Sequence, residues 1–224
     1  MRLTPLQRRR LANFKANRRA FWSLWIFLVI FTVTLFAEFV ANDRPLVVRF
    51  EGEWRFPIFQ FYSEADFGGE FQTEAEYASP EVRCLIASGG LEACLDDPEG
   101  TLEQIPTGAV DGAPIADPGW ALWPPIRFSY NTVDAELSVP APAPPSWTMS
   151  TKARCAYYPQ GVSDPDCTMG NYHWLGTDDG GRDIVARLLY GFRISVLFGL
   201  TLALVSSAIG IAVGALQGFF GGWV

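Results

Sequence analysis

Two long apolar runs dominate the hydrophobic pattern of the chain. The first covers residues 21–40 and contains one charged residue, Glu38, near its far end. The second covers residues 194–224 and contains no charged residue. Because a helix of roughly 20 apolar residues spans the hydrocarbon core of a bilayer, the pattern predicts two transmembrane helices, at 21–40 and at 194–220.

The region between the runs, residues 41–172, has only short apolar segments. Residues 46–50 and 54–59 predict two strands joined by a turn at Gly52, and 120–130 is a third aromatic segment. This region holds 15 of the 16 prolines, and proline breaks helix interiors. We therefore expect an irregular, β-leaning domain in which 92–117 forms loops and the proline-rich residues 139–147 form an extended connector.

A short amphipathic segment precedes the second apolar run. Asp178 and Asp179 suit the first turn of a helix, where short acidic side chains accept free amide hydrogens. Apolar residues then recur at helical spacing, and Asp183 with Arg187 forms a favourable i,i+4 pair. The pattern predicts a short helix within 173–193, lying at the outer membrane surface.

Small residues recur every four positions along the second predicted span, at Ser206, Gly210, Gly214 and Gly218. Such a stripe lets another helix approach closely in lipid. A homodimer contact, or the general frequency of glycine in membrane helices, would give the same pattern. The stripe favours packing in a bundle of helices.

Charge is distributed unevenly around the first span. Residues 1–20 contain seven Lys and Arg and no acid, whereas 41–192 contains 23 acidic and 9 basic residues. Cations close to a span are retained in the cytoplasm, so 1–20 is expected to be a cytoplasmic basic stub on the bilayer surface and 41–193 to lie outside. A cleaved signal peptide is disfavoured because the run exceeds the roughly 7–15 residues of such a core. The arginine run could also be a nucleic-acid patch, but its position beside a span makes membrane orientation the simpler explanation, so we expect no nucleic-acid partner.

Four cysteines, Cys84, Cys94, Cys155 and Cys167, all lie in the outer region. Cysteines outside the cytoplasm usually pair, and four cysteines permit three connectivities. The local pairs Cys84–Cys94 and Cys155–Cys167 close the shortest loops and are our prediction. A zinc site is disfavoured because no CxxC occurs and the chain has one histidine.

The usual signatures of catalysis are missing from the sequence. Any Ser-His-Asp or Cys-His arrangement would have to use His173, the one histidine. The sequence contains neither a GxSxG motif nor a phosphate-binding glycine loop followed by lysine. We therefore predict no catalytic, cofactor-binding or metal site.

The segment HWLGTDDGGRDIVARLLYGFRISVLFGL resembles the C-type permease subunits of oligopeptide and dipeptide ABC importers. Their hallmark before the second span is H-x-L-G-T-D-x-x-G-R-D, a hydrophobic pair, x-R, a second hydrophobic pair and Y-G-x-R-x-S. The matching positions are His173, Leu175, Gly176, Thr177, Asp178, Gly181, Arg182, Asp183, Arg187, Tyr190, Gly191, Arg193 and Ser195.

Upstream segments narrow the resemblance to one branch of that family. WSLWIFLVIF, ANDRPLVVRF, FPIFQFYSEADFGG and LWPPIRF are similar to the branch that serves peptide and microcin C uptake. Residues around 82–118 and 148–170 look like insertions relative to that branch. They contain all four cysteines, so the resemblance gives the cysteines no inherited role.

The resemblance implies a permease subunit in a bacterial inner membrane that binds no nucleotide and is not itself an enzyme. Its expected partners are a second permease subunit, ABC ATPase subunits and a periplasmic peptide-binding protein. Such permeases have about six spans, with the loop that engages the ATPase after the third or a later one. The chain therefore resembles the N-terminal portion of a permease, as a truncated product or with the rest encoded elsewhere, and we expect no autonomous transport from it.

Two other classes of function fit parts of the sequence. A membrane-anchored periplasmic sensor or interaction domain with two spans would also fit the topology, but it predicts a cytoplasmic signalling domain or a homodimer. An anchored periplasmic enzyme rests only on the size of the outer region and would depend on His173.

Overall fold

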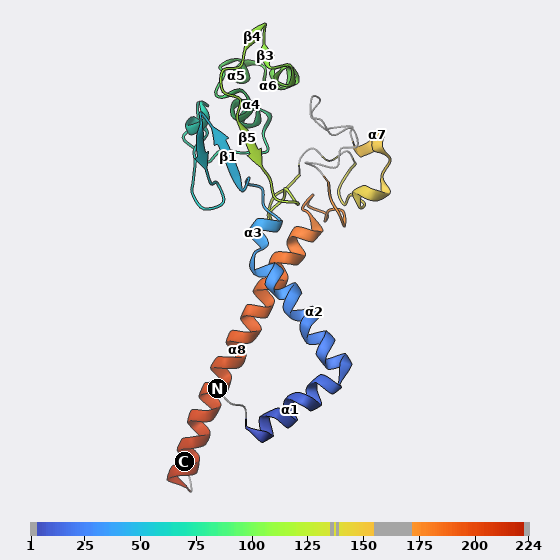
Figure 1. Ribbon diagram of the computed structural model, residues 1–224, viewed down its shortest axis with the longest axis vertical. Helices are drawn as coiled ribbons and strands as arrows, with labels where there is room; N and C mark the ends of the chain where they lie inside the picture. Colours follow the sequence, from blue (N-terminus) through green and yellow to red (C-terminus); the bar gives the residue numbers. More distant parts are fainter. Residues whose placement is uncertain (1–3, 135–136, 138, 155–171, 222–224) are drawn as a thin grey trace. The chain divides into compact units, whose positions relative to one another are not determined.

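The computed structural model describes residues 4–134, 137, 139–154 and 172–221 of the 224-residue chain. It divides the chain into two compact units. We call Met1–Phe36 with Leu189–Val224 the helical unit, and Ala37–Leu188 the mixed unit. Figure 1 shows the long helices of the first and the short strands and helices of the second.

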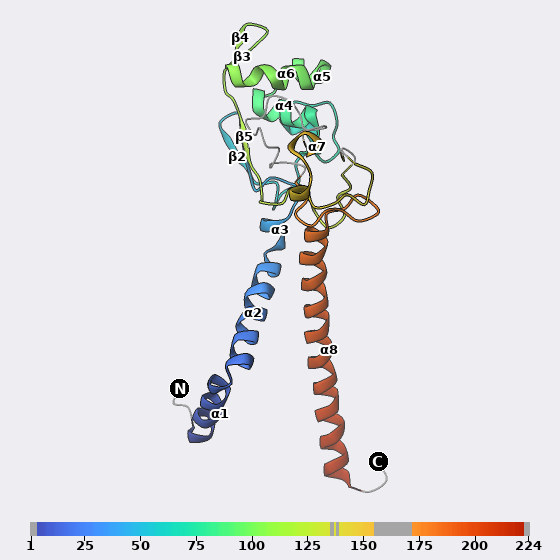
Figure 2. The ribbon, with the colours of Figure 1, turned by 90° about the vertical axis from the view of Figure 1, so that its right-hand side faces the viewer.

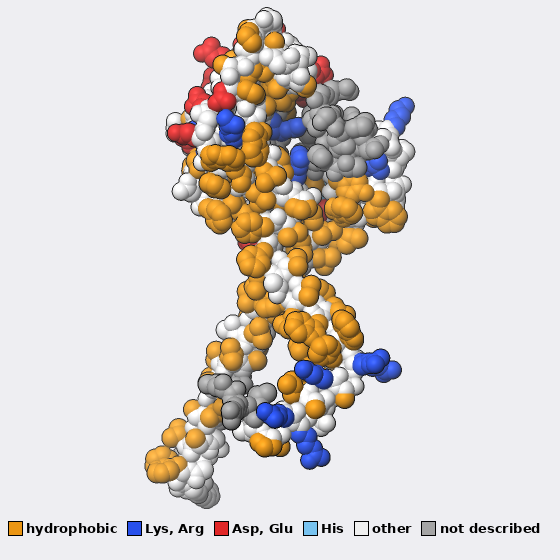
Figure 3. Space-filling model, in the orientation of Figure 1, with side chains coloured by type: hydrophobic (Ala, Val, Ile, Leu, Met, Phe, Trp, Pro, Cys, Tyr) orange, Lys and Arg blue, Asp and Glu red, His pale blue; other side chains and the backbone are white. Residues whose placement is uncertain are grey.

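Two helices open the helical unit. Helix α1 (Pro5–Ala16) begins at Thr4, whose hydroxyl and amide exchange hydrogen bonds with Gln7 in a capping box. Asn17 ends α1 and accepts a hydrogen bond from the Ala20 amide at the start of α2 (Arg18–Leu35). None of the α1 residues is buried, and its Lys and Arg side chains project in Figure 3.

Helix α2 is apolar and long enough to cross a membrane. The predicted span 21–40 differs from it at the end, because the helix breaks at Phe36 and a separate turn, α3 (Ala37–Val40), follows. With 18 residues, α2 is about 27 Å long at 1.5 Å per residue. The first predicted span is therefore a helix, starting and ending slightly earlier than expected.

The second apolar helix, α8 (Ile184–Phe220), runs without interruption for 37 residues, as Figure 2 shows. Helix α8, like α2, is apolar and long enough to cross a membrane. The separate amphipathic helix predicted within 173–193 is wrong: its apolar residues form the first turns of α8. Gly191 is the one helix-breaking residue there, and a single glycine costs only about 1 kcal/mol in a helix.

The mixed unit contains a three-stranded antiparallel sheet of order β2-β1-β5. Strand β1 (Val47–Phe50) turns into β2 (Glu53–Arg55) through Glu51 and Gly52, both at positive φ, as a tight hairpin requires. The predicted hairpin is present, but β2 ends before Pro57, which has no amide hydrogen to donate. Strand β5 (Trp120–Leu122) pairs with the other edge of β1.

The expectation of loops across 92–117 is wrong. Within that stretch the structure has two short helices, α5 (Ala93–Asp96) and α6 (Pro98–Gln104), and a third, α4 (Pro80–Ser88), precedes it. Pro80 and Pro98 occupy the first helical position, where the missing amide hydrogen costs nothing, and Ser79 and Asp97 cap the two helices. The described part of the mixed unit is therefore helical as well as β, rather than β-leaning.

The remaining elements of the mixed unit are small. They are the 3-10 helices η1 (Glu64–Phe67), η2 (Ile105–Thr107) and η3 (Ser146–Thr148), the two-stranded sheet of β3 (Ala109–Val110) with β4 (Ala113–Pro114), and α7 (Thr151–Arg154). The connector 139–147 has no strand or helix before η3.

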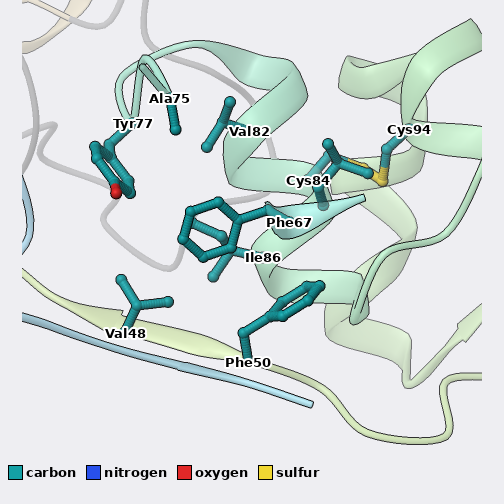
Figure 4. Packing of buried hydrophobic residues seen from close by; sticks show 10 residues of the cluster. Val48, Phe50, Phe67, Ala75, Tyr77, Val82, Cys84, Ile86 and Cys94 are labelled. Atoms are coloured by element: carbon teal, nitrogen blue, oxygen red, sulfur yellow. A yellow bond between two sulfur atoms is a disulfide. The ribbon is translucent and has the colours of Figure 1, made fainter. Parts of the chain in front are cut away.

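The core of the mixed unit lies between the sheet and α4 (Figure 4). Phe50 from β1 meets Phe67 edge to face, with ring centroids 5.4 Å apart. Val48, Val82 and Leu85 are fully buried beside them. Cys84 and Cys94 are joined in a disulfide that links α4 to α5 at one side of this core, whereas Cys155 and Cys167 lie outside the described residues.

Candidate functional site

The segment that carries the signature motif begins with a turn closed by Asp178. Its Oδ1 accepts hydrogen bonds from the amides of Gly180 (2.9 Å) and Arg182 (2.8 Å), and its Oδ2 forms an ion pair with Arg187. The hydrogen bond from the Arg182 amide, with that from Gly180 and the nearby cations, lowers the pKa of this carboxyl. Asp178 therefore caps a turn and not the helix, and Arg187 pairs with it instead of with Asp183.

Asp183 is the residue that caps helix α8. Its side chain is fully buried, and Oδ1 accepts a hydrogen bond of 2.7 Å from the amide of Ala186. Its other oxygen, Oδ2, lies 2.9 Å from Nδ1 of His173. One carboxylate therefore satisfies a free amide of the first helical turn and at the same time holds the histidine.

His173 lies at the centre of the site and is 2% exposed. Its Nε2 is 3.1 Å from Oδ2 of Asp134, and its ring stacks on Phe128 with centroids 4.2 Å apart. An ionised carboxylate can only accept hydrogen bonds. Because both ring nitrogens face carboxylate oxygens, the geometry suits a doubly protonated imidazolium held between two aspartates.

Burial and hydrogen bonding act in opposite directions on this imidazole. Burial alone lowers the pKa of His173, because it penalises the charged form. The hydrogen bonds to Asp134 and Asp183, with the charges of the two carboxylates, raise the pKa and outweigh burial. The net shift is upward, in agreement with the geometry.

The proline-rich connector packs against the signature segment through paired hydrogen bonds. The amide of Ala143 donates to Thr177 Oγ1 (2.9 Å), and the Thr177 amide donates to the Ala143 carbonyl (3.0 Å). Ser146 and His173 make a second such pair, with 2.9 Å in each direction. The connector, residues 139–147, is therefore held against the signature segment by hydrogen bonds, and we call it the docked connector.

The geometry of this cluster can be compared with that of a catalytic Ser-His-Asp arrangement and with that of a metal site. A Ser, a His and an Asp are present, but the Ser146 hydroxyl accepts a hydrogen bond from the backbone amide of His173, and both ring nitrogens of His173 face carboxylates. Ser146 is also buried. Within the residues that the structure describes, no group of three His, Cys, Asp or Glu has the arrangement of a metal site.

Comparisons with known proteins address the family directly. The family described as the N-terminal TM domain of oligopeptide transport permease C matches residues 4–51. A peptidoglycan transport system permease protein, YejE, of Agrobacterium fabrum is 44% identical over 98% of this chain and 50% of its own length. The inner membrane ABC transporter permease protein YejE of Escherichia coli is 39% identical over 100% of this chain and 50% of its own.

The predicted resemblance to the oligopeptide permease family is confirmed. An oligopeptide transport system permease protein, OppC, of Mycobacterium tuberculosis is 46% identical over a shorter stretch of 54 residues. All these relatives are named as permease proteins and not as enzymes. The chain spans about half the length of the two YejE permeases. No solved structure matches it.

The remaining signature residues of this permease family divide between the turn and helix α8. Gly176 and Gly181 both have positive φ, of 81° and 74°, where glycine is favoured. On α8, Tyr190 is buried and Arg193 lies 5.0 Å from the centre of its ring. Four signature residues are exposed: Leu175, Arg187, Gly191 and Ser195.

Among the residues that the structure describes, none packs against the small-residue stripe of α8. A Cβ added at Gly210, Gly214 or Gly218 would meet nothing within 4 Å, and Ser206 is exposed. The structure therefore leaves the stripe open, and its use for helix packing stays a prediction.

Three residues of the histidine cluster were not predicted from the sequence: Asp134, Phe128 and Ser146. Asp134 lies 39 positions before His173, and no motif marks it. The backbone brings it in, because the Asp134 amide donates to the Gly181 carbonyl at 3.0 Å. Only this pairing of distant segments could have identified the second carboxylate.

The raised pKa of His173 predicts a dependence of stability on pH. The ordinary pKa is 6.5 and the folded value is higher, so the stabilisation is complete below about pH 6.5 and is lost as the pH rises through the folded value. We expect the thermal unfolding temperature of the mixed unit, followed by near-UV circular dichroism, to fall from pH 6 towards pH 9. The change His173→Gln should flatten this slope; an unchanged slope in that variant would contradict the assignment.

Proposed function

We propose that this chain supplies the N-terminal part of the permease subunit of an ATP-driven ABC importer for oligopeptides or peptide-like compounds such as microcin C. The observation that carries the proposal is the match of essentially the whole chain to permeases at 44% and 39% identity. The two apolar helices, α2 and α8, supply the membrane-crossing elements that a permease needs.

In this proposal the chain lies in a bacterial inner membrane with its N-terminus in the cytoplasm. The seven cations of residues 1–20 support that orientation, and residues 41–193 then lie in the periplasm. The disulfide Cys84–Cys94 suits that compartment.

The histidine cluster has a mechanical role in the proposal. Asp183 ties the first turn of α8 to His173, and His173 ties it to Asp134. The docked connector adds backbone hydrogen bonds on another side. The cluster and the connector therefore attach the first turn of α8 to the rest of the mixed unit.

The partners in this proposal are a second permease subunit, ABC ATPase subunits and a periplasmic peptide-binding protein. ATP would be hydrolysed by the ATPase subunits and not by this chain. The open stripe from Ser206 to Gly218 gives a second permease helix a surface for close packing.

Co-purification tests the assembly. The affinity-tagged protein, solubilised from its native membrane, should retain a second permease and an ATPase, identified by mass spectrometry. Recovery of the tagged protein alone, under conditions that keep a known importer of this class intact, would refute the assignment.

Crosslinking tests the packing surface. A cysteine at Gly214 should form a crosslink to a different membrane protein, whereas a cysteine at Leu216, about 200° away around the helix at 100° per residue, should not. Crosslinks between two copies of this chain at Gly214, and no others, would favour a homodimer instead.

A further inference from the structure

The sheet of the mixed unit has a second face, turned away from its core, and this face is largely apolar. Val48 and Phe50 are buried in the core. Side chains alternate along a strand, so Arg49 lies on the opposite face, and the register places it across from both Trp54 and Trp120. The two tryptophan rings meet edge to face at 5.5 Å, yet they remain 58% and 42% exposed.

The apolar surface continues beyond the strands. Leu122 pairs with Val47 on the same face of the sheet and is exposed. After β2 the chain makes a turn, closed by the Phe59 amide on the Phe56 carbonyl at 3.0 Å, and Phe59 is 72% exposed. We call the exposed set the aromatic face: Trp54, Phe56, Phe59, Trp120 and Leu122.

The aromatic face is tied to the end of a membrane-crossing helix. The ring of Phe59 contacts that of Phe39, with centroids 6.0 Å apart, and both residues belong to the mixed unit. Phe39 lies in α3, four residues beyond Leu35, the last residue of α2. Four residues reach at most about 14 Å, so Phe39 and Phe59 stay near the membrane surface, where aromatic rings are enriched.

The charge on this face differs from that of its surroundings. Residues 41–192 contain 23 acids and 9 bases, but the outward positions of the three strands contain one charged residue, Arg49, and no acid. Figure 3 shows hydrophobic side chains gathered around the sheet and α3. The exposed Glu51 and Glu53 lie at the hairpin end of the same sheet. Aromatic rings beside a cation suit the carbonyl and phosphate groups of phospholipids.

We propose that the aromatic face docks on the phospholipid headgroup region of the membrane leaflet beside the mixed unit. Large exposed apolar patches on folded domains mark interaction surfaces, and the chain connection to α2 makes lipid the partner that is always within reach. Docking would hold the sheet against the bilayer, independently of any transport that the protein performs.

Photocrosslinking tests the proposal in the full chain, reconstituted into phosphatidylcholine vesicles. The crosslinker p-benzoylphenylalanine replaces Phe59 in one variant and Phe71 in another. Phe71 is a matched control because it is a phenylalanine of the same unit, 60% exposed, outside the aromatic face. We expect several-fold more lipid adduct at position 59 than at position 71, measured by mass spectrometry of the crosslinked peptide.

A second variant separates docking from simple proximity. With the crosslinker in place of Trp120, the added change Phe59→Ser should reduce the lipid adduct several-fold, while near-UV circular dichroism shows that the mixed unit stays folded. Equal lipid adducts at positions 59 and 71 would overturn the proposal. So would crosslinking of position 59 to a protein in native membranes in place of lipid, which would identify the face as a protein-docking surface.

Discussion

The change His173→Ala is expected to lower the free energy of unfolding of the mixed unit by about 3–5 kcal/mol, the usual cost of breaking a buried ion pair by removing one partner. The imidazole is the hydrogen-bond partner of Asp134 and Asp183 on either side. Without it, two carboxylates remain close together in a buried site and lose the cation that lies between them. Asp183 would then also be a less effective cap for α8.

Urea unfolding of the full chain in detergent micelles, followed by near-UV circular dichroism, measures this loss. Asp179→Asn is the matched control, because Asp179 lies in the same segment but is exposed. We expect it to change the unfolding free energy by less than about 0.5 kcal/mol, as surface substitutions usually do. A loss of similar size in both variants would show that the segment is sensitive to any change and that the cluster has no special role.

The change Gly176→Ala should be nearly as damaging, with a loss of more than about 2 kcal/mol, because a left-handed backbone conformation alone costs a residue with a Cβ about 1–2 kcal/mol. Gly176 has a φ of 81°, and an added Cβ would lie 2.3 Å from the Ala143 carbonyl oxygen. That oxygen belongs to the backbone of the docked connector and accepts the Thr177 amide, so it cannot move without breaking this pair.

Gly199→Ala is the control for Gly176→Ala. Gly199 lies within α8, and an added Cβ there meets nothing within 4 Å. Alanine is favoured over glycine in helices by about 1 kcal/mol, so this variant should be neutral or slightly more stable in the same urea experiment. A stable Gly176→Ala protein with an intact near-UV spectrum would contradict the close packing of the connector.

The helices of the helical unit could be predicted almost completely from the sequence. Their long apolar runs need no tertiary contact to identify them, and both runs are helical in the structure. The error was at the start of α8, where the acidic pair Asp178 and Asp179 suggested a cap. Aspartates at 178, 179 and 183 look equivalent in sequence, and only the burial of Asp183 next to His173 decides which one caps the helix.

The mixed unit is less predictable from the sequence, because more of its structure depends on contacts between separate segments. The hairpin of β1 and β2 is local, and its turn residues indicated it. The sequence does not indicate helices α4 and α6, because proline usually breaks a helix, whereas Pro80 and Pro98 stand at the first position of these two. Asp134 and Ser146, two partners of His173, lie 39 and 27 positions away in the chain, and no spacing rule reaches that distance.

The sequence by itself determined the two long apolar helices and the resemblance to the oligopeptide permeases, and it predicted the orientation of the chain, because hydropathy, charge and a signature motif are properties of consecutive residues. Only the tertiary structure shows which groups the signature residues contact. It gathers a histidine, two buried aspartates and a docked connector around the first turn of α8. Buried polar groups must find partners, and which partners they find depends on segments that only folding brings together.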